Sequence, residues 1–191
     1  MHSKLVKHST GKPDLWLDVF PRTILKASKD GLLIVSVTIE NLKFEEMEKG
    51  SDLIHKFWSL NSEFEPALEL VEVLEQIKED LKMGLADKNQ IILVAKADDK
   101  IIGIVRAEVS PNRFYGSKPM GKIVEFYVAP SHRRTGAGEA LLNAILAKLS
   151  EREVELVTAE FPTQNVVATS FYEKNGFAPF FTVYSKRLAE D

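Results

Sequence analysis

The segment from Val124 to Leu142, VEFYVAPSHRRTGAGEALL, holds residues whose types and spacing suit the binding of an anion. An apolar, strand-like run ends at Pro130, two arginines follow, and Gly136-Ala137-Gly138 stands where a helical pattern begins. Glycine lets a backbone approach a ligand without a Cβ clash, and the first N–H groups of a helix have no partners within it. The helix dipole and the donors of Arg133 and Arg134 add to the attraction. The segment predicts a phosphate or pyrophosphate site; the alternative is a helix that merely begins after a glycine turn.

Strand and helix patterns surround this segment along the chain. Runs rich in β-branched and apolar residues predict strands at 32–40, 90–96, 100–109, 122–129, 154–159 and, more broadly, at 177–188. Apolar residues at helical spacing predict helices at about 42–60, 63–83, 136–151 and 166–175. We expect the first helix to break near Gly50, with Ser51 as a new N-cap, and Asn165 to cap the last helix. This order predicts one mixed α/β (α+β) domain over residues 31–191.

The first 30 residues are assigned to an N-terminal extension. The run from Asp14 to Phe20 is apolar enough to be a short edge strand that ends at Pro21. Because these apolar side chains are too many to leave exposed, we expect an added strand or hairpin and not a disordered tail.

Composition excludes several classes of function. The chain has 191 residues and no cysteine, which removes disulfides, thiolate metal sites and a cysteine nucleophile. The four histidines are scattered without ligand spacing, so we expect no metal site. The net charge of −3 disfavours broad nucleic-acid binding. Because no apolar run reaches the roughly 20 residues that span a bilayer, we expect no membrane segment and a cytoplasmic location.

Two motifs resemble those of one known family. The run Arg133 to Gly138, RRTGAG, resembles the Q/R-x-x-G-x-G/A signature of the GNAT family, the Gcn5-related N-acetyltransferases, and the run Phe126 to Pro130 resembles that family's fourth strand. Downstream, Asn165 to Phe177 resembles its second hallmark, A-x-x-x-Y-x-x-x-G-F. The motifs stand in the family's order and at its spacing, and the resemblance covers about residues 32–188.

The resemblance implies a GNAT-like sheet of about six to seven strands with flanking helices, and acetyl-CoA as the cofactor. Backbone amides of the glycine loop would hold the pyrophosphate, and the pantetheine arm would lie along the fourth strand, where that strand is splayed from its neighbour. An amide near Phe126 would polarise the thioester carbonyl. The residues implied to bind the cofactor are Phe126, Tyr127, Val128, Arg133, Arg134, Thr135, Gly136, Ala137, Gly138, Glu139 and Asn165.

Two residues are the candidate catalytic groups that the resemblance suggests. Tyr172 matches the tyrosine that commonly protonates the leaving thiolate in the family; the alternative is ordinary helix packing beside Phe171. Glu125 is a candidate base, since the attacking amine must first lose a proton. Strand alternation puts Glu125 on the same side as Tyr127, and a purely structural carboxylate is the equal alternative.

The acceptor is less defined than the donor. The leading hypothesis is transfer of an acetyl group to a primary amine by direct attack on the thioester. One alternative is a non-catalytic acyl-CoA-binding module on the same fold, and another is acetylation of a protein N-terminus or lysine. Residues 31–90 hold six Lys or Arg and thirteen Asp or Glu, which suits a cationic acceptor unless this is simply a solvated helix face. A homodimer through the terminal strands is a further option that the resemblance implies.

Overall fold

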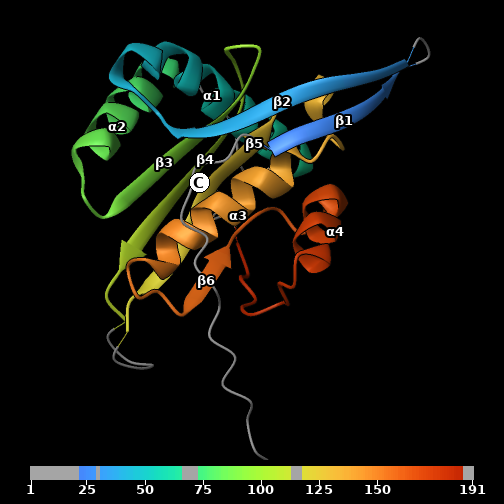
Figure 1. Cartoon of the computed structure of the whole chain (residues 1–191). Coiled ribbons are helices and arrows are strands. Elements are labelled where there is room, and N and C mark those ends of the chain that lie inside the picture. The colour runs from blue at the N-terminus through green and yellow to red at the C-terminus, as the bar shows by residue number, and fades with distance from the viewer. Residues whose placement is uncertain (1–21, 29–30, 66–72, 113–117, 187–191) are drawn as a thin grey trace, which may run out of the picture.

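A single open sheet of six strands, in the order β1 to β6, organises the fold (Figure 1). The computed structural model describes residues 22–28, 31–65, 73–112 and 118–186. The strands are β1 (Arg22–Ser28), β2 (Gly31–Asn41), β3 (Gln90–Ala97), β4 (Lys100–Ser110), β5 (Met120–Val128) and β6 (Leu156–Ala159). Neighbours are antiparallel except β5 and β6, which are parallel and are therefore joined by a helical crossover.

Helices cover both faces of this sheet. The helices are α1 (Met47–Phe64), α2 (Leu74–Ala86), α3 (Ala137–Ser150) and α4 (Val166–Lys174), with short 3₁₀ turns η1 (Phe44–Glu46) and η2 (Pro130–His132). Residues of α1 and α2 share one core cluster with β3, β4 and β5, whereas α3 belongs to a second cluster. Among the described residues, no helix combines the length and apolar character needed to cross a bilayer.

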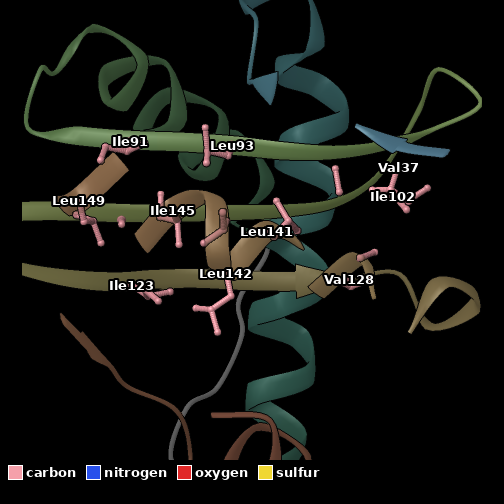
Figure 2. Close-up of a cluster of buried hydrophobic side chains, with 14 of the residues drawn as sticks. Val37, Ile91, Leu93, Ile102, Ile123, Val128, Leu141, Leu142, Ile145 and Leu149 are labelled. Carbon is pink, nitrogen blue, oxygen red and sulfur yellow. The ribbon is translucent and has the colours of Figure 1, made fainter. Parts of the chain in front are cut away.

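The core beneath α3 explains why that helix forms where the sequence predicts it. Leu141, Leu142, Ile145 and Leu149 recur at helical spacing and are fully buried. Figure 2 shows these side chains facing others from β3, β4 and β5, among them Ile91, Leu93, Ile123 and Val128. This packing fixes the start of α3 against the carboxyl end of β5.

Two irregularities of β5 shape the site. Arg106 pairs with Glu125 but Ala107 pairs with Ile123, so Val124 is an extra, bulged residue that resets the alternation of side chains. On its other edge β5 pairs with β6 only from Met120 to Ile123. From Val124 to Val128 that edge has no neighbouring strand among the described residues. The two strands are therefore splayed apart here, as expected for the segment that resembles the fourth strand of the GNAT family.

Most of the predicted elements are confirmed. The strands expected at 32–40, 90–96, 100–109, 122–129 and 154–159 correspond to β2 to β6, and the last two helices to α3 and α4. β1 lies before residue 31, where the sequence placed the start of the domain. It pairs with β2 as a hairpin that crosses this predicted boundary. The strand expected at 14–20 lies outside the described residues.

The predicted break at Gly50 is wrong. α1 continues from Met47 through Gly50 and Ser51 to Phe64. A Cβ at Gly50 would lie 3.1 Å from a methyl group of Leu42 and 3.2 Å from one of Leu81. Glycine therefore stands here because α1 packs closely against its neighbours, and not because the helix ends.

Two other predicted boundaries differ from the structure. The helix predicted at 63–83 corresponds to α2, which runs from Leu74 to Ala86. Glu63 and Phe64, predicted at its start, are instead the last two residues of α1. No strand forms over 177–186, although this segment is rich in strand-forming residues. Strand propensity reflects packing on a neighbouring strand, and Phe181 and Tyr184 are 73% and 92% exposed without one.

Candidate active site

A cavity of about 420 Å³ opens where β5 separates from β6. Its walls come from the second half of α1, the splayed end of β5, the loop before α3, and α4. The chain segments that carry the two sequence motifs therefore meet at one cavity. Of the predicted site residues, the cavity is lined by Phe126, Tyr127, Val128, Arg133, Arg134, Gly136, Gly138, Glu139, Asn165 and Tyr172.

The glycine loop turns sharply into α3. Arg134 and Gly136 both have left-handed backbones, with φ of +60° and +87°. Ala140 is the first residue whose N–H donates within the helix, to Gly136 O at 2.9 Å. The N–H groups of the preceding turn, from Ala137 to Glu139, therefore have no helical acceptor, and the dipole makes this end of α3 positive. This arrangement can hold an anionic group beside the cavity.

The two arginines of the loop have different surroundings. Arg133 Nε donates to Val128 O at 2.9 Å, and its guanidinium lies 5.4 Å from the centre of the Tyr127 ring. Arg133 thus ties the loop to the end of β5. Arg134 is exposed and borders the cavity, so its guanidinium is the one placed to meet an anion from solvent.

Three other predicted loop residues contribute less directly. Thr135 Oγ1 donates to His132 O at 2.7 Å and so stabilises the turn, and neither Thr135 nor Ala137 lines the cavity. Glu139 lines it but is held by an ion pair with Lys174 of α4, at 2.7 Å. The side chains of Thr135 and Ala137 are therefore not placed to contact a ligand in the cavity.

Tyr172 sits in an aromatic cluster at the base of the cavity. It is 8% exposed, stacks on Phe161 with ring centres 5.3 Å apart, and contacts Phe126 edge-on at 6.3 Å. Burial raises the pKa of the Tyr172 hydroxyl above its ordinary value of 10.0. The phenol therefore keeps its proton at neutral pH, as a proton donor must.

Asn165 both caps α4 and borders the cavity. Its Oδ1 accepts the N–H of Ala168 at 3.0 Å, which confirms the predicted N-cap. The side chain is 6% exposed. The cap fixes where α4 begins and hence where Tyr172, two turns later, is presented.

Glu125 does not line the cavity. It is 1% exposed and its two oxygens accept from Arg106, Oε2 from Nε at 2.5 Å and Oε1 from Nη2 at 2.7 Å. Trp58 of α1 donates to Oε1 at 3.3 Å, and Asp80 of α2 pairs with the other side of Arg106. Burial raises the pKa of Glu125 and the Arg106 guanidinium opposes that rise. Of the two alternatives for Glu125, these contacts favour the structural carboxylate, because a base needs access to the amine.

The wall formed by α1 is the part of the site that the sequence indicated least. Phe57, Leu60, Asn61 and Phe64 line the cavity from this helix. From the sequence, Phe57 and Phe64 could be either core or substrate-wall aromatics, and nothing pointed to Asn61. A signal was present, because Phe57, Asn61 and Phe64 stand at positions i, i+4 and i+7 of one helix face, and Asn61 is the polar residue among them. Among the described residues, no cluster of three or more acidic or histidine side chains could hold a metal ion.

This chain is similar to known proteins in sequence and in fold. Residues 52–177 match the profile of the acetyltransferase (GNAT) family. A mycothiol acetyltransferase from Saccharomonospora viridis is 29% identical over 107 residues, which cover 54% of this chain. The chain spans only 35% of the length of that relative.

Solved structures also share the fold. An aminoglycoside N-acetyltransferase in complex with CoA aligns with a TM-score of 0.67 and 17% identity, over 81% of this chain and 95% of the other. A ribosomal-protein-alanine N-acetyltransferase from Brucella melitensis aligns with a TM-score of 0.60 and 19% identity, over 80% and 99%. The profile match spans most of the chain and includes both the glycine loop and Tyr172. This chain belongs to the GNAT acetyltransferase family.

Proposed function

We propose that this protein is an acetyl-CoA-dependent N-acetyltransferase that acts on the primary amine of a small molecule. The observation that carries the proposal is the continuity of one cavity, which joins the positive end of α3, the unpaired edge of β5 and the buried hydroxyl-bearing ring of Tyr172. An acyl-CoA needs all three: donors for its pyrophosphate, a polar edge for its amide-containing arm, and an acid near its sulfur.

The residues present fit acetyl-CoA as the donor substrate. The N–H groups from Ala137 to Glu139 and the side chain of Arg134 would bind the pyrophosphate, since both are donors at the mouth of the cavity. The edge of β5 from Val124 to Val128 offers backbone donors and acceptors to the amides of the pantetheine arm, in the manner of an added strand. The CoA complex of the related aminoglycoside N-acetyltransferase supports this choice of donor.

The reaction places simple demands on the protein. The lone pair of a neutral amine attacks the carbonyl carbon of the thioester, a C–N bond forms and the C–S bond breaks. The amine loses one proton and the leaving sulfur gains one. A backbone N–H near Phe126 would stabilise the carbonyl oxygen as negative charge develops on it. Tyr172, which carries its proton at neutral pH, would donate it to the leaving sulfur.

Glu125 is assigned a positioning role in this proposal. It connects β5 to α1 through Trp58 and to β4 through Arg106. These contacts hold the bulge at Val124 in place, directly before the free edge of β5. The proton of the amine would then leave through water in the cavity.

The test compares turnover with binding. Purified protein should consume acetyl-CoA with at least some members of a panel of primary amines at mildly alkaline pH. Tyr172→Phe should lower kcat by about 100-fold while leaving the Kd for acetyl-CoA within about twofold. Tyr184→Phe, at a ring that is 92% exposed, is the matched control and should behave as wild type.

Three outcomes separate the candidate functions. Tight binding of acetyl-CoA without any turnover would replace the enzyme with a non-catalytic acyl-CoA-binding module. Turnover with peptides and none with small amines would favour a protein acceptor, as the name of the Brucella melitensis structure indicates for that protein. Unchanged kcat in Tyr172→Phe would remove Tyr172 as the acid.

A further inference from the structure

Asn61 has an unsatisfied polar group in an apolar setting. Its side chain is 3% exposed and lines the cavity, yet its Oδ1 is buried with no hydrogen-bond partner among the described residues. Leaving a buried amide oxygen unpaired costs about 1 to 3 kcal/mol, so such groups call for an explanation. A ligand in the cavity that donates an N–H would supply the missing partner.

The surrounding wall of α1 is otherwise apolar. Phe57, Leu60 and Phe64 are the other α1 residues that line the cavity. Within the described part of the chain, the acidic side chains that line the cavity are Glu139 and Glu160, and both are already in ion pairs, with Lys174 and Lys122, each at 2.7 Å. A polycationic acceptor needs several carboxylates to replace its hydration, and this wall provides none.

The two sides of the cavity therefore suit different substrates. The end near α3 and α4 carries Arg134 and the free N–H groups, which suit the anionic acyl donor. The acceptor amine must then approach from the α1 side. Since the amine has to be neutral to attack, an N–H of that amine can donate to a neutral acceptor and still keep its lone pair for the carbonyl.

We propose that the acceptor is a primary amine on an aromatic or bulky apolar body without further charges, and that Asn61 Oδ1 orients its nitrogen by accepting an N–H. Phe57, Leu60 and Phe64 enclose the body. This inference rests on the proposed acetyltransferase function. It makes Asn61 a residue that determines acceptor specificity.

The first part of the test compares acceptors. 2-Phenylethylamine and tryptamine should be acetylated with kcat/KM about tenfold or more above that for spermidine and kanamycin, at a fixed saturating concentration of acetyl-CoA. A preference for spermidine or kanamycin would overturn the inference. So would binding of acetyl-CoA, seen as a thermal shift, with no acetylation of either apolar amine. Absence of the thermal shift itself would instead overturn the proposed function.

The second part tests Asn61. Asn61→Leu should raise the KM for 2-phenylethylamine about five- to tenfold and leave the KM for acetyl-CoA unchanged, because one neutral hydrogen bond to the acceptor is lost. The variant should melt no lower than wild type, since it removes an unsatisfied buried oxygen. Asn143→Leu, at an exposed position of α3, is the matched control and should change neither KM. An unchanged acceptor KM in Asn61→Leu would contradict the assignment.

Discussion

Replacing Arg106 by methionine should isolate a negative charge in the sheet. Among the described residues, Arg106 is the only charged group that donates a hydrogen bond to Glu125, and Glu125 is 1% exposed. Methionine keeps most of the volume of the arginine stem but offers no donor. After the change the one donor left to Glu125 among the described residues would be Trp58 Nε1, at 3.3 Å.

The expected magnitude follows from burial. Breaking a buried pair by removing one partner costs about 3 to 5 kcal/mol, because the other charge remains out of water. Part of this cost is relieved by protonation. Without Arg106, nothing positive opposes the effect of burial, so the pKa of Glu125 rises further above its ordinary value of 4.5.

That rise gives the loss a defined pH dependence. A group whose pKa is higher in the folded than in the unfolded state stabilises the fold below the unfolded pKa, and this stability is lost as pH rises. Both proteins lose this stability as pH rises above 4.5, but the variant continues to lose it after Glu125 of wild type has ionised. The difference between wild type and Arg106→Met should therefore begin to grow at the folded pKa of wild type, by about 1.4 kcal/mol per pH unit, until the higher folded pKa of the variant is passed.

Urea unfolding at several pH values measures this difference. Lys118→Met is the matched control, because Lys118 and Glu155 form an ion pair at 2.6 Å with side chains that are 50% and 67% exposed. Its loss should stay below about 1 kcal/mol at every pH. A loss under about 1 kcal/mol in Arg106→Met at pH 7, or a loss that is the same at pH 4 and at pH 8, would show that Arg106 does not stabilise the buried charge of Glu125.

Three further changes have outcomes that the structure sets. Above about pH 10, the free energy of unfolding should fall less steeply in Tyr172→Phe than in wild type. The pKa of the buried phenol is raised, so wild type loses about 1.4 kcal/mol per pH unit there. Parallel curves for the two proteins in alkaline urea titrations would contradict this. Gly103→Ala should destabilise by about 1 to 3 kcal/mol, since the new Cβ would lie 3.0 Å from Tyr127 O; calorimetry that shows an unchanged Tm would exclude the close contact. Asn165→Ala should cost about 1 kcal/mol by removing the acceptor for the Ala168 N–H, whereas Asn165→Asp should retain most of the stability in the same urea assay.

The donor side of the site was predictable from the sequence for local reasons. A strand, a glycine loop and an amphipathic helix are consecutive in the chain, so their spacing alone places Gly136 and Gly138 at the start of α3. Asn165 and Tyr172 are likewise within one short helix. Each of these positions depends on contacts between residues that are near one another in sequence.

The acceptor side depends on contacts between distant segments. Asn61 faces the cavity only because α1 packs on β5, some 65 residues later, and nothing near Asn61 in the sequence reports that packing. The helix break predicted at Gly50 was wrong for the same reason. Glycine is needed there because Leu42 and Leu81 pack closely against α1, and not because the helix ends. Glu125 was found but its role was open until the structure placed Arg106 beside it.

Thermal unfolding with and without acetyl-CoA tests directly whether the cavity and the glycine loop bind the acyl donor. At about 100 times its Kd, acetyl-CoA should stabilise the protein by about 2.7 kcal/mol, which for a chain of this size is a rise in Tm of roughly 5 to 10 °C. Gly138→Val, which places methyl groups between the start of α3 and the Phe171 ring at the cavity, should abolish most of that rise. A large shift with acetyl-CoA and little with ATP is the predicted result. No shift with acetyl-CoA in the wild-type protein would mean that the glycine loop is only a structural turn, and would contradict the account of the site.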